Sequence, residues 1–307
     1  MDNSSDRQTD RQTDRQTDRQ TDRQTARRKR RWLTIALAIA LAISLSANVG
    51  LFYKWHQAKG AKSHSILTVT GETTTWRPLA DTGLVEKWQP DESAVAKLAQ
   101  RVNDGQLKCL FIGNSITLHP INDYWWGEWG MAADAQENDY VHVVTSALAK
   151  NVRVNYNVCN FSTWEVMSHD RGEVLPMLDT QLASDYDLIV IQLGENVKDV
   201  TTLQADFSEL IRYCRGKAPN AAIIVVGNFW QNDTVEEAKE AASAAENVSF
   251  ADLKPIMDSP EAECSMGSVV KDKNGNTHEV QHAGVAKHPN NLGMQVIANI
   301  VLQAALQ

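Results

Sequence analysis

Short strand-like segments alternate with amphipathic stretches along residues 105–307, and this alternation constrains the fold most strongly. The segments with the character of buried strands are residues 108–113, 152–158, 187–193, 221–226 and 248–253. Helix-like stretches separate and follow them at residues 139–150, 164–183, 202–216, 234–246 and 293–306. Most of these strands have no polar face and need cover on both sides, so the pattern predicts an α/β fold with a central parallel sheet of about five strands. Such sheets place ligands at the carboxyl ends of their strands.

Charge divides the chain into a basic head and an acidic body. Residues 1–62 hold 13 Lys/Arg against 6 Asp/Glu, a formal charge of +7, and residues 63–307 hold 17 against 32, a charge of −15. A protein that binds nucleic acid needs a basic surface to neutralise phosphates. The acidic body therefore argues against a nucleic-acid partner.

The head begins with a repeat. Residues 6–25 are five copies of Asp-Arg-Gln-Thr, and no copy contains an apolar residue, so we expect a disordered tail. The tetranucleotide GACA, read continuously, encodes this peptide cycle in all three frames. We therefore hypothesise a repeat tract in the gene whose changes in length switch expression on and off.

A basic cluster at residues 27–31 is followed by a segment, residues 32–53, that has no charged residue and the length of a membrane-spanning helix. The positive-inside rule then predicts a single-pass protein of the inner (cytoplasmic) membrane, with its body in the periplasm or outside the cell. A signal peptide cleaved near residues 44–47 is the alternative, and it also exports the body. The predicted parts are a cytoplasmic tail (1–31), an anchor (32–53), a linker with an N-terminal wrap (54–104) and a globular domain (105–307).

The four cysteines are widely spaced and form no C-x-x-C pair, which argues against a metal cluster or a dense disulfide framework. Cys109 and Cys159 lie in strand-like runs and are expected to be buried free thiols. An exported body permits a disulfide, but nothing in the sequence requires one. No P-loop, zinc triad or dinucleotide fingerprint is present, so we predict no metal and no cofactor.

Polar residues suited to acyl transfer stand at the predicted strand ends. Ser115 follows the first strand, where its hydroxyl would be exposed and nearby backbone N–H groups could bind an oxyanion. Asn196 follows the third strand and can either direct its amide at a developing negative charge or cap the next helix. His288 precedes the last helix and is a candidate general base. Each feature alone is common, but together they indicate a serine hydrolase.

Taken in this order, the motifs G-N-S-I-T (113–117), G-E-N (194–196) and H-P-N-N-L-G (288–293) resemble the nucleophile, oxyanion and histidine blocks of the SGNH/GDSL hydrolase superfamily. The resemblance covers roughly residues 105–307. It implies a flavodoxin-like three-layer α/β sandwich and the hydrolysis of acyl esters. It further implies that Ser115 attacks, that His288 takes its proton, and that the Ser115 N–H and the Asn196 side chain hold the oxyanion.

Three departures from the family pattern affect the predicted site. Val285 stands where the family has the aspartate that orients the histidine, so Asp252, Glu279 or a backbone carbonyl in a Ser–His dyad must take that role. No glycine occurs in residues 157–165 to supply an oxyanion N–H, and the backbone near Ser162 is the expected substitute. Asn114 replaces the usual aspartate beside the nucleophile.

Aromatic residues Trp125, Trp126 and Trp129 lie in a long loop, residues 119–131, where they either bind a sugar or pack locally. With the predicted export, they favour an esterase that removes small acyl groups, above all acetyl, from a cell-envelope or extracellular glycan. One alternative is an O-acyltransferase acting on a surface polysaccharide or peptidoglycan, although the chain shows no multi-span acyl-donor module. Another is a non-catalytic glycan-binding protein. The sequence does not set the oligomeric state.

Overall fold

The computed structural model describes residues 66–75, 77, 105–150, 152–168 and 170–305. The predicted repeat tail, the predicted anchor at residues 32–53 and most of the predicted linker lie outside these residues. Within the described ranges, none of the helices combines the length and the apolar composition needed to cross a bilayer.

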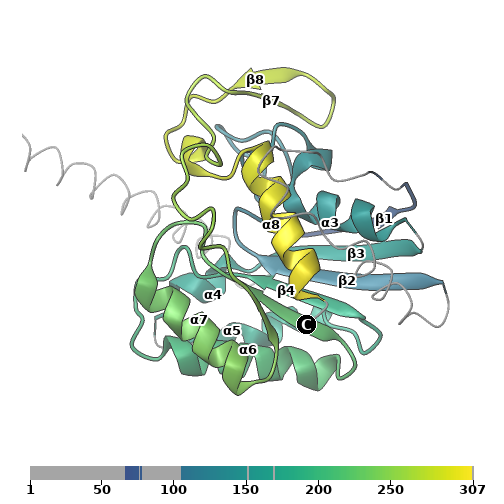
Figure 1. The fold of residues 1–307 in the computed structure, drawn as a ribbon, viewed down its shortest axis with the longest axis vertical. Coiled ribbons are helices and arrows are strands. Elements are labelled where there is room, and N and C mark those ends of the chain that lie inside the picture. Colours follow the sequence, from purple (N-terminus) through teal and green to yellow (C-terminus); the bar gives the residue numbers. More distant parts are fainter. Residues whose placement is uncertain (1–65, 76, 78–104, 151, 169, 306–307) are drawn as a thin grey trace, which may run out of the picture. The chain divides into compact units, whose positions relative to one another are not determined.

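One six-stranded sheet organises the domain, with the strand order β1-β3-β2-β4-β5-β6 (Figure 1). Its strands are β1 (Thr68–Thr73), β2 (Gln106–Gly113), β3 (Arg153–Asn160), β4 (Leu188–Gln192), β5 (Ala222–Val226) and β6 (Ser249–Ala251). All neighbouring pairs are parallel except β1 and β3. In chain order the five parallel strands run second, first, third, fourth, fifth, which is the flavodoxin-like order. The predicted parallel sheet and α/β class are confirmed.

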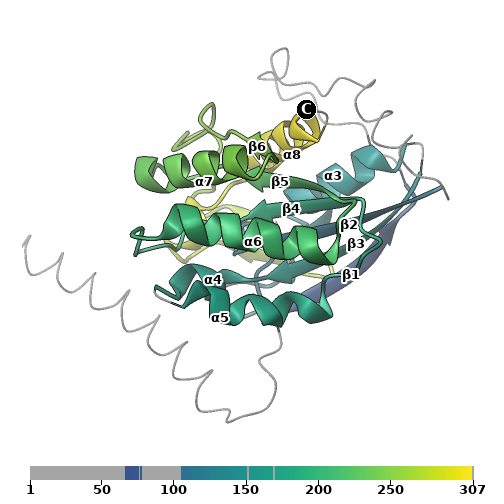
Figure 2. The same cartoon turned by 90° about the horizontal axis from the view of Figure 1, so that it is seen from below.

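Helices cover both faces of this sheet (Figure 2). Helices α3 (Tyr140–Leu148) and α8 (Asn291–Ala304) pack on one face, and α6 (Leu203–Lys217) and α7 (Asp233–Ala245) pack on the other. The helix-like stretch predicted at residues 164–183 is helical but divided into α4 (Ser162–Val166), α5 (Arg171–Val174) and the 3₁₀ helix η3 (Leu175–Thr180). Pro176 lies in the first turn of η3 and has no N–H to continue an α-helix from Gly172.

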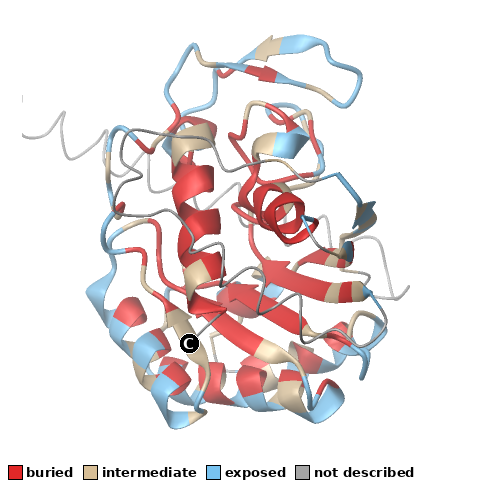
Figure 3. Cartoon of the chain, turned by 45° about the vertical axis from the view of Figure 1, so that its right-hand side comes forward, coloured by how far each residue is buried: buried red, intermediate tan, exposed pale blue. Residues whose placement is uncertain are grey.

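Side chains of the central strands alternate between two apolar cores, one on each face of the sheet. On β2, Leu107 and Phe111 belong to the core under α3 and α8, whereas Leu110 and Ile112 belong to the core under α6 and α7. Figure 3 shows the central strands largely in the colour of buried residues. All four cysteines are buried and free, which confirms the thiols predicted at Cys109 and Cys159.

Two further elements were not anticipated from the sequence. Strand β1 pairs with β3 through six residue pairs, from Thr68 with Cys159 to Thr73 with Val154, so the sheet includes residues before the predicted boundary at 105. Between β6 and α8 the chain forms a two-stranded hairpin of β7 (Val269–Lys271) and β8 (Thr277–Glu279). Short 3₁₀ turns, η2 (Gln136–Asn138) and η4 (Val285–Lys287), precede α3 and α8.

Candidate active site

Ser115 stands on a tight turn that leaves β2 at its carboxyl end. The carbonyl of Asn114 accepts hydrogen bonds from the N–H groups of Thr117 at 3.1 Å and Leu118 at 2.9 Å, which closes the turn. A Cβ atom on Gly113 would lie 1.9 Å from the Thr117 hydroxyl oxygen, so only glycine fits before this turn. The Ser115 side chain is partly exposed, as an attacking hydroxyl must be.

His288 meets Ser115 across 173 positions of sequence. Its Nε2 lies 2.7 Å from the Ser115 Oγ, and its Nδ1 lies 2.8 Å from the carbonyl oxygen of Gly284. A carbonyl oxygen only accepts, so Nδ1 carries the ring hydrogen and Nε2 is the free acceptor that faces the serine hydroxyl. This is the tautomer that a general base requires. The predicted pair of Ser115 and His288 is therefore brought together.

The group that orients His288 is a backbone carbonyl, and the two carboxylates proposed from the sequence lie elsewhere. The Asp252 Oδ1 accepts the Lys254 N–H at 2.8 Å, and Glu279 belongs to the β7–β8 hairpin. Val285 is buried in the core and its backbone carbonyl receives the His288 N–H at 3.0 Å. The 3₁₀ turn η4 thus directs the Gly284 carbonyl at the imidazole, and the arrangement is a Ser–His dyad.

The surroundings of His288 hold its imidazole neutral. Burial lowers the pKa of His288 to about 4, opposed by the hydrogen bond from Nδ1 to Gly284, and His119 and His282 lower it further by charge repulsion. The Trp230 ring meets the imidazole edge-on at 5.0 Å, and the Trp230 indole N–H donates to the Lys287 carbonyl at 2.9 Å. His288 is therefore unprotonated at neutral pH, and the Trp230 ring packs against one side of its imidazole.

Two other histidines near the predicted motifs have partners of their own. The His119 Nδ1 contacts the Pro120 carbonyl at 2.7 Å, and the His142 Nδ1 contacts the Asp139 carboxylate at 2.7 Å on α3. Among the residues with described positions, no group of three or more His, Cys, Asp or Glu side chains is arranged to hold a metal ion.

Asn196 lies on the loop that follows β4, as predicted, and its side chain is exposed. Gly194 makes the loop possible, since its φ of 136° disfavours other residues and a Cβ would lie 2.6 Å from the Asn228 Oδ1. The Asn196 Nδ2 donates to the buried carboxylate of Glu165 at 2.6 Å. This contact uses one of the two amide hydrogens and leaves the other for an oxyanion.

Ser162 does not serve as the predicted second oxyanion donor. Its backbone N–H and its hydroxyl both donate to the Asn160 Oδ1, at 3.1 Å and 2.7 Å. These contacts fold the end of β3 into α4 and occupy both donors. The backbone N–H of Ser115 and the Asn196 amide remain the candidate oxyanion donors.

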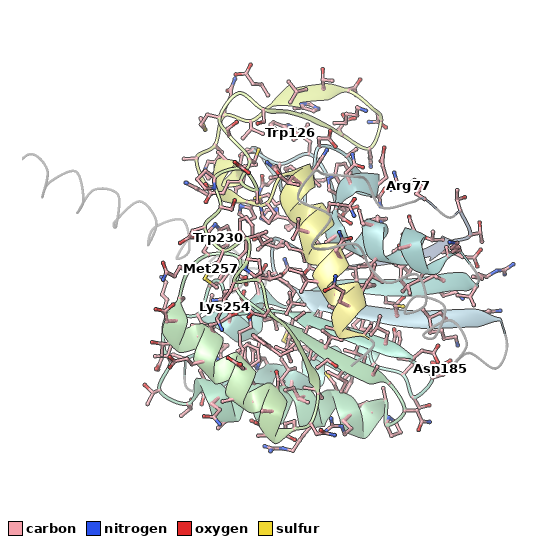
Figure 4. The ribbon with its side chains drawn as sticks, viewed as in Figure 1. Arg77, Trp126, Asp185, Trp230, Lys254 and Met257 are labelled. Atoms are coloured by element: carbon pink, nitrogen blue, oxygen red, sulfur yellow. The ribbon has the colours of Figure 1, made fainter. Side chains whose placement is uncertain are left out.

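The tryptophan loop divides into core and surface residues. Trp125 and Trp129 are 0% and 3% exposed and pack edge to face, so the prediction that they bind substrate is wrong. Their rings fill the apolar core beside α8 instead. Trp126 is half-buried and stacks on His278 of the β7–β8 hairpin, with ring centroids 4.4 Å apart (Figure 4 labels Trp126 beside the hairpin).

A second stacked pair joins the same loop to the segment before His288. The Tyr124 ring lies 4.2 Å from that of His282, and both side chains are exposed. The Gly284 carbonyl contacts the His288 Nδ1, and a Cβ atom on Gly284 would lie 3.0 Å from the His282 ring, which places this pair near the dyad. Sequence reasoning missed His278, His282 and Trp230, because their only signal was their residue type and nothing tied them to a distant aromatic loop.

Comparison with known proteins gives structural neighbours only. No family model matches the chain, and no curated protein matches it. Solved structures similar to the chain include carbohydrate esterases, a lipolytic protein of the G-D-S-L family and a phage tail fibre protein.

Three of these neighbours show the extent of the likeness. A carbohydrate esterase of family 2 from Myceliophthora fergusii is 14% identical, with a TM-score of 0.39, and 65% of each chain is covered. A two-domain esterase active on acetylated mannans is 14% identical with a TM-score of 0.46, covering 70% of this chain and 53% of that one. A lipolytic G-D-S-L protein from Veillonella parvula is 14% identical with a TM-score of 0.41, covering 64% and 97%. The chain thus spans less than two thirds of the first two proteins.

Proposed function

We propose that the chain is a serine esterase that hydrolyses small acyl esters through an acyl-enzyme on Ser115. The observation that carries the proposal is the contact of 2.7 Å between the Ser115 Oγ and the His288 Nε2, with Nδ1 held by the Gly284 carbonyl. A serine hydroxyl is a weak nucleophile until an adjacent base takes its proton, and this geometry supplies that base in the required tautomer.

In the proposed reaction, the Ser115 Oγ attacks the ester carbonyl while its proton passes to the His288 Nε2. The Ser115 N–H and the Asn196 amide then donate to the oxyanion of the tetrahedral intermediate. His288 returns the proton to the departing alcohol, which leaves an acyl group on Ser115. Water then attacks the acyl carbonyl while His288 takes its proton, and this proton passes to the Ser115 Oγ as the bond between Oγ and the acyl group breaks and the acid leaves. A base held by a carbonyl is weaker than one in a full triad, which suits activated and acetyl esters better than amides.

For the substrate, we propose an acetylated glycan of the cell envelope or of the surroundings. Exposed rings of Tyr124 and His282 lie beside the dyad, and Trp126 stacks on the nearby hairpin. Such rings offer flat surfaces on which the C–H faces of sugars pack. The placement of the catalytic domain outside the inner membrane is part of the same proposal, supported by the basic cluster and the uncharged segment at residues 27–53.

The test uses the full chain with p-nitrophenyl acetate and then with acetylated polysaccharides. We expect a burst of p-nitrophenol, and we expect Ser115→Ala to lower turnover at least a thousandfold because the nucleophile is lost. Ser208→Ala on α6 is the matched control and should stay within about twofold of the original chain. If Ser115→Ala kept more than a tenth of the activity, the nucleophile would be misassigned. Faster loss of ester with an added sugar acceptor, without matching acid release, would indicate a transferase.

A further inference from the structure

A buried carboxylate that the proposed reaction does not use lies behind the site. Glu165 sits on α4 and is 1% exposed. Its Oε1 accepts the Gly194 N–H at 2.6 Å, the Asn114 Nδ2 at 3.0 Å and, more weakly, the Asn196 N–H at 3.4 Å. Its Oε2 accepts the Asn196 Nδ2 at 2.6 Å. Every partner is a donor, so the pocket is built for the ionised, acceptor-only form of Glu165.

These contacts fix which way the Asn196 amide points. An ionised carboxylate cannot donate, so the Asn196 nitrogen, and not its oxygen, must face Glu165. With one hydrogen held there, the second hydrogen of the same nitrogen has a fixed direction. The Gly194 N–H bond to the same carboxylate holds the loop that carries Asn196. Glu165 therefore fixes both the position of the loop after β4 and the orientation of the Asn196 amide on that loop.

The same carboxylate also holds the nucleophile turn. The Asn114 Nδ2 donates one hydrogen to Glu165 and the other to the Glu195 Oε2 at 2.8 Å, while its Oδ1 accepts the Ile116 N–H at 3.0 Å. Asn114 immediately precedes Ser115. Glu165 thus accepts a hydrogen bond from Asn114, the neighbour of the nucleophile, and another from the side-chain amide of Asn196, the candidate oxyanion donor.

We propose that Glu165 is a positioning residue that fixes the oxyanion donor Asn196 relative to the nucleophile Ser115. The inference rests on the proposed esterase function and adds to it a residue that does not touch the substrate. A buried charge is costly unless donors surround it, and here those donors belong to the two loops that carry the proposed chemistry.

Other charged groups near Glu165 come from the loop after β4 and from helices α7 and α5. Burial raises the pKa of Glu165, and Glu195, on the loop after β4, raises it further by repulsion. On α7, the ammonium of Lys239 donates to the Asn228 Oδ1 at 2.7 Å, and Glu236 accepts the Asn228 N–H at 2.8 Å. Arg171 of α5 is turned to Asp206, with which it pairs at 2.6 Å. None of these groups hydrogen-bonds to Asn196, so they do not substitute for Glu165 as its partner.

The test is Glu165→Gln in the full chain, assayed with p-nitrophenyl acetate. Glutamine has one oxygen and one NH₂ group in place of the two carboxylate oxygens. If the NH₂ group replaces Oε2, the Asn196 Nδ2 loses its acceptor; if it replaces Oε1, it opposes the Gly194 N–H and the Asn114 Nδ2. Either orientation disturbs the amide of Asn196 or the loop that carries it. We expect kcat to fall tenfold to a thousandfold, with KM changed less than about threefold, because the donor acts on the transition state. Glu236→Gln is the matched control, equally buried and bonded to a backbone N–H, and should keep kcat within about threefold.

A double-mutant cycle with Asn196→Ala separates positioning from a general structural role. Once the amide is gone, Glu165→Gln should lower kcat by less than about threefold further, because the two changes remove the same contribution. If Glu165→Gln does not fold, Glu165→Asp takes its place in the cycle, with the same expectation. An unchanged kcat in either Glu165 variant, or a loss that persists in full in the Asn196→Ala background, would overturn the inference. Absence of activity in the original chain, or its survival in Ser115→Ala, would instead refute the esterase function.

Discussion

At the scale of single residues, Asn114 shows why this chain departs from the usual aspartate beside the nucleophile. Both hydrogens of its amide are used, one by Glu165 and one by Glu195. An aspartate at this position would set a third carboxylate against these two and would have no hydrogen to give them. The asparagine is therefore required by the two glutamates, because it donates one amide hydrogen to each of them.

The pH dependence of the rate follows from the same residues. Burial, with repulsion from Glu195, raises the pKa of Glu165 from 4.5 to about 7, whereas burial lowers the pKa of His288 to about 4. Below about pH 7 a growing fraction of Glu165 is protonated and no longer an acceptor-only partner for Asn196. We expect kcat/KM for an ester to rise with pH through about 7, although His288 is already neutral there.

Glu165→Gln removes this titration and should flatten the profile between about pH 5 and 8, at a lower rate. Glu236→Gln, which alters a neighbouring buried carboxylate, should keep the rise near 7. The measurement is kcat/KM for p-nitrophenyl acetate between about pH 5 and 8 in the original chain and in both variants. A rise of the same size and midpoint in Glu165→Gln would assign the titration to another group.

The sequence was sufficient to name candidate side chains for the proposed chemistry, and insufficient to name the groups that hold them. Ser115 and Asn196 follow from their places at strand ends, His288 from its place before the last helix, and all three from the motifs around them. The partner of His288 is a backbone carbonyl, which has no signature in residue type, and its direction depends on the 3₁₀ turn η4. Glu165 was equally hidden, since a glutamate on a short helix usually faces solvent.

At the scale of elements, the position of Val285 in the 3₁₀ turn η4 determines the effect of placing a carboxylate there. The family pattern alone predicts that Val285→Asp restores the missing acid and raises turnover. In the structure Val285 is 1% exposed and packs in the core under α3 and α8. We expect Val285→Asp to bury an unpaired carboxylate, to lower the free energy of unfolding by about 2 kcal/mol or more, and to reduce activity.

Denaturant unfolding and turnover of the same preparation check this expectation. Val285→Ala, which removes only methyl groups, is the control and should keep the turnover of the folded protein. Turnover higher in Val285→Asp than in the original chain would mean that the loop before His288 follows the family geometry after all.

Element boundaries were predicted well where hydrophobic pattern and strand length agreed. Each of the five parallel strands lies within about two residues of its expected position, and so do the helices α3, α6, α7 and α8. Strand β1 was missed because its polar residues, the sequence TVTGET, suit a surface wrap as well as an edge strand. Trp125 and Trp129 were misplaced because a tryptophan suits a core and a sugar site alike, and only tertiary packing distinguishes the two.

At the scale of the whole molecule, the orientation across the membrane is open to direct measurement. The basic cluster at residues 27–31 predicts that the N-terminus stays in the cytoplasm and that the catalytic domain is outside. Protease added to spheroplasts should digest the domain and spare a tag at the N-terminus. Digestion of the tag with protection of the domain would reverse the topology and remove the reason for proposing an envelope glycan.

The pairing of β1 with β3 has a consequence for self-association. A chain cut at residue 105 would leave the eight residues of β3 as an open edge, with backbone N–H and C=O groups free to pair with a second molecule. The opposite edge, β6, is only three residues long and offers little to such pairing. We expect a fragment of residues 105–307 to oligomerise or precipitate on size-exclusion chromatography, while the chain that keeps β1 does not. A monodisperse fragment would show that the edge of β3 is protected in another way. Association of the fragment would show that the six residues of β1 prevent neighbouring copies from pairing through their sheets.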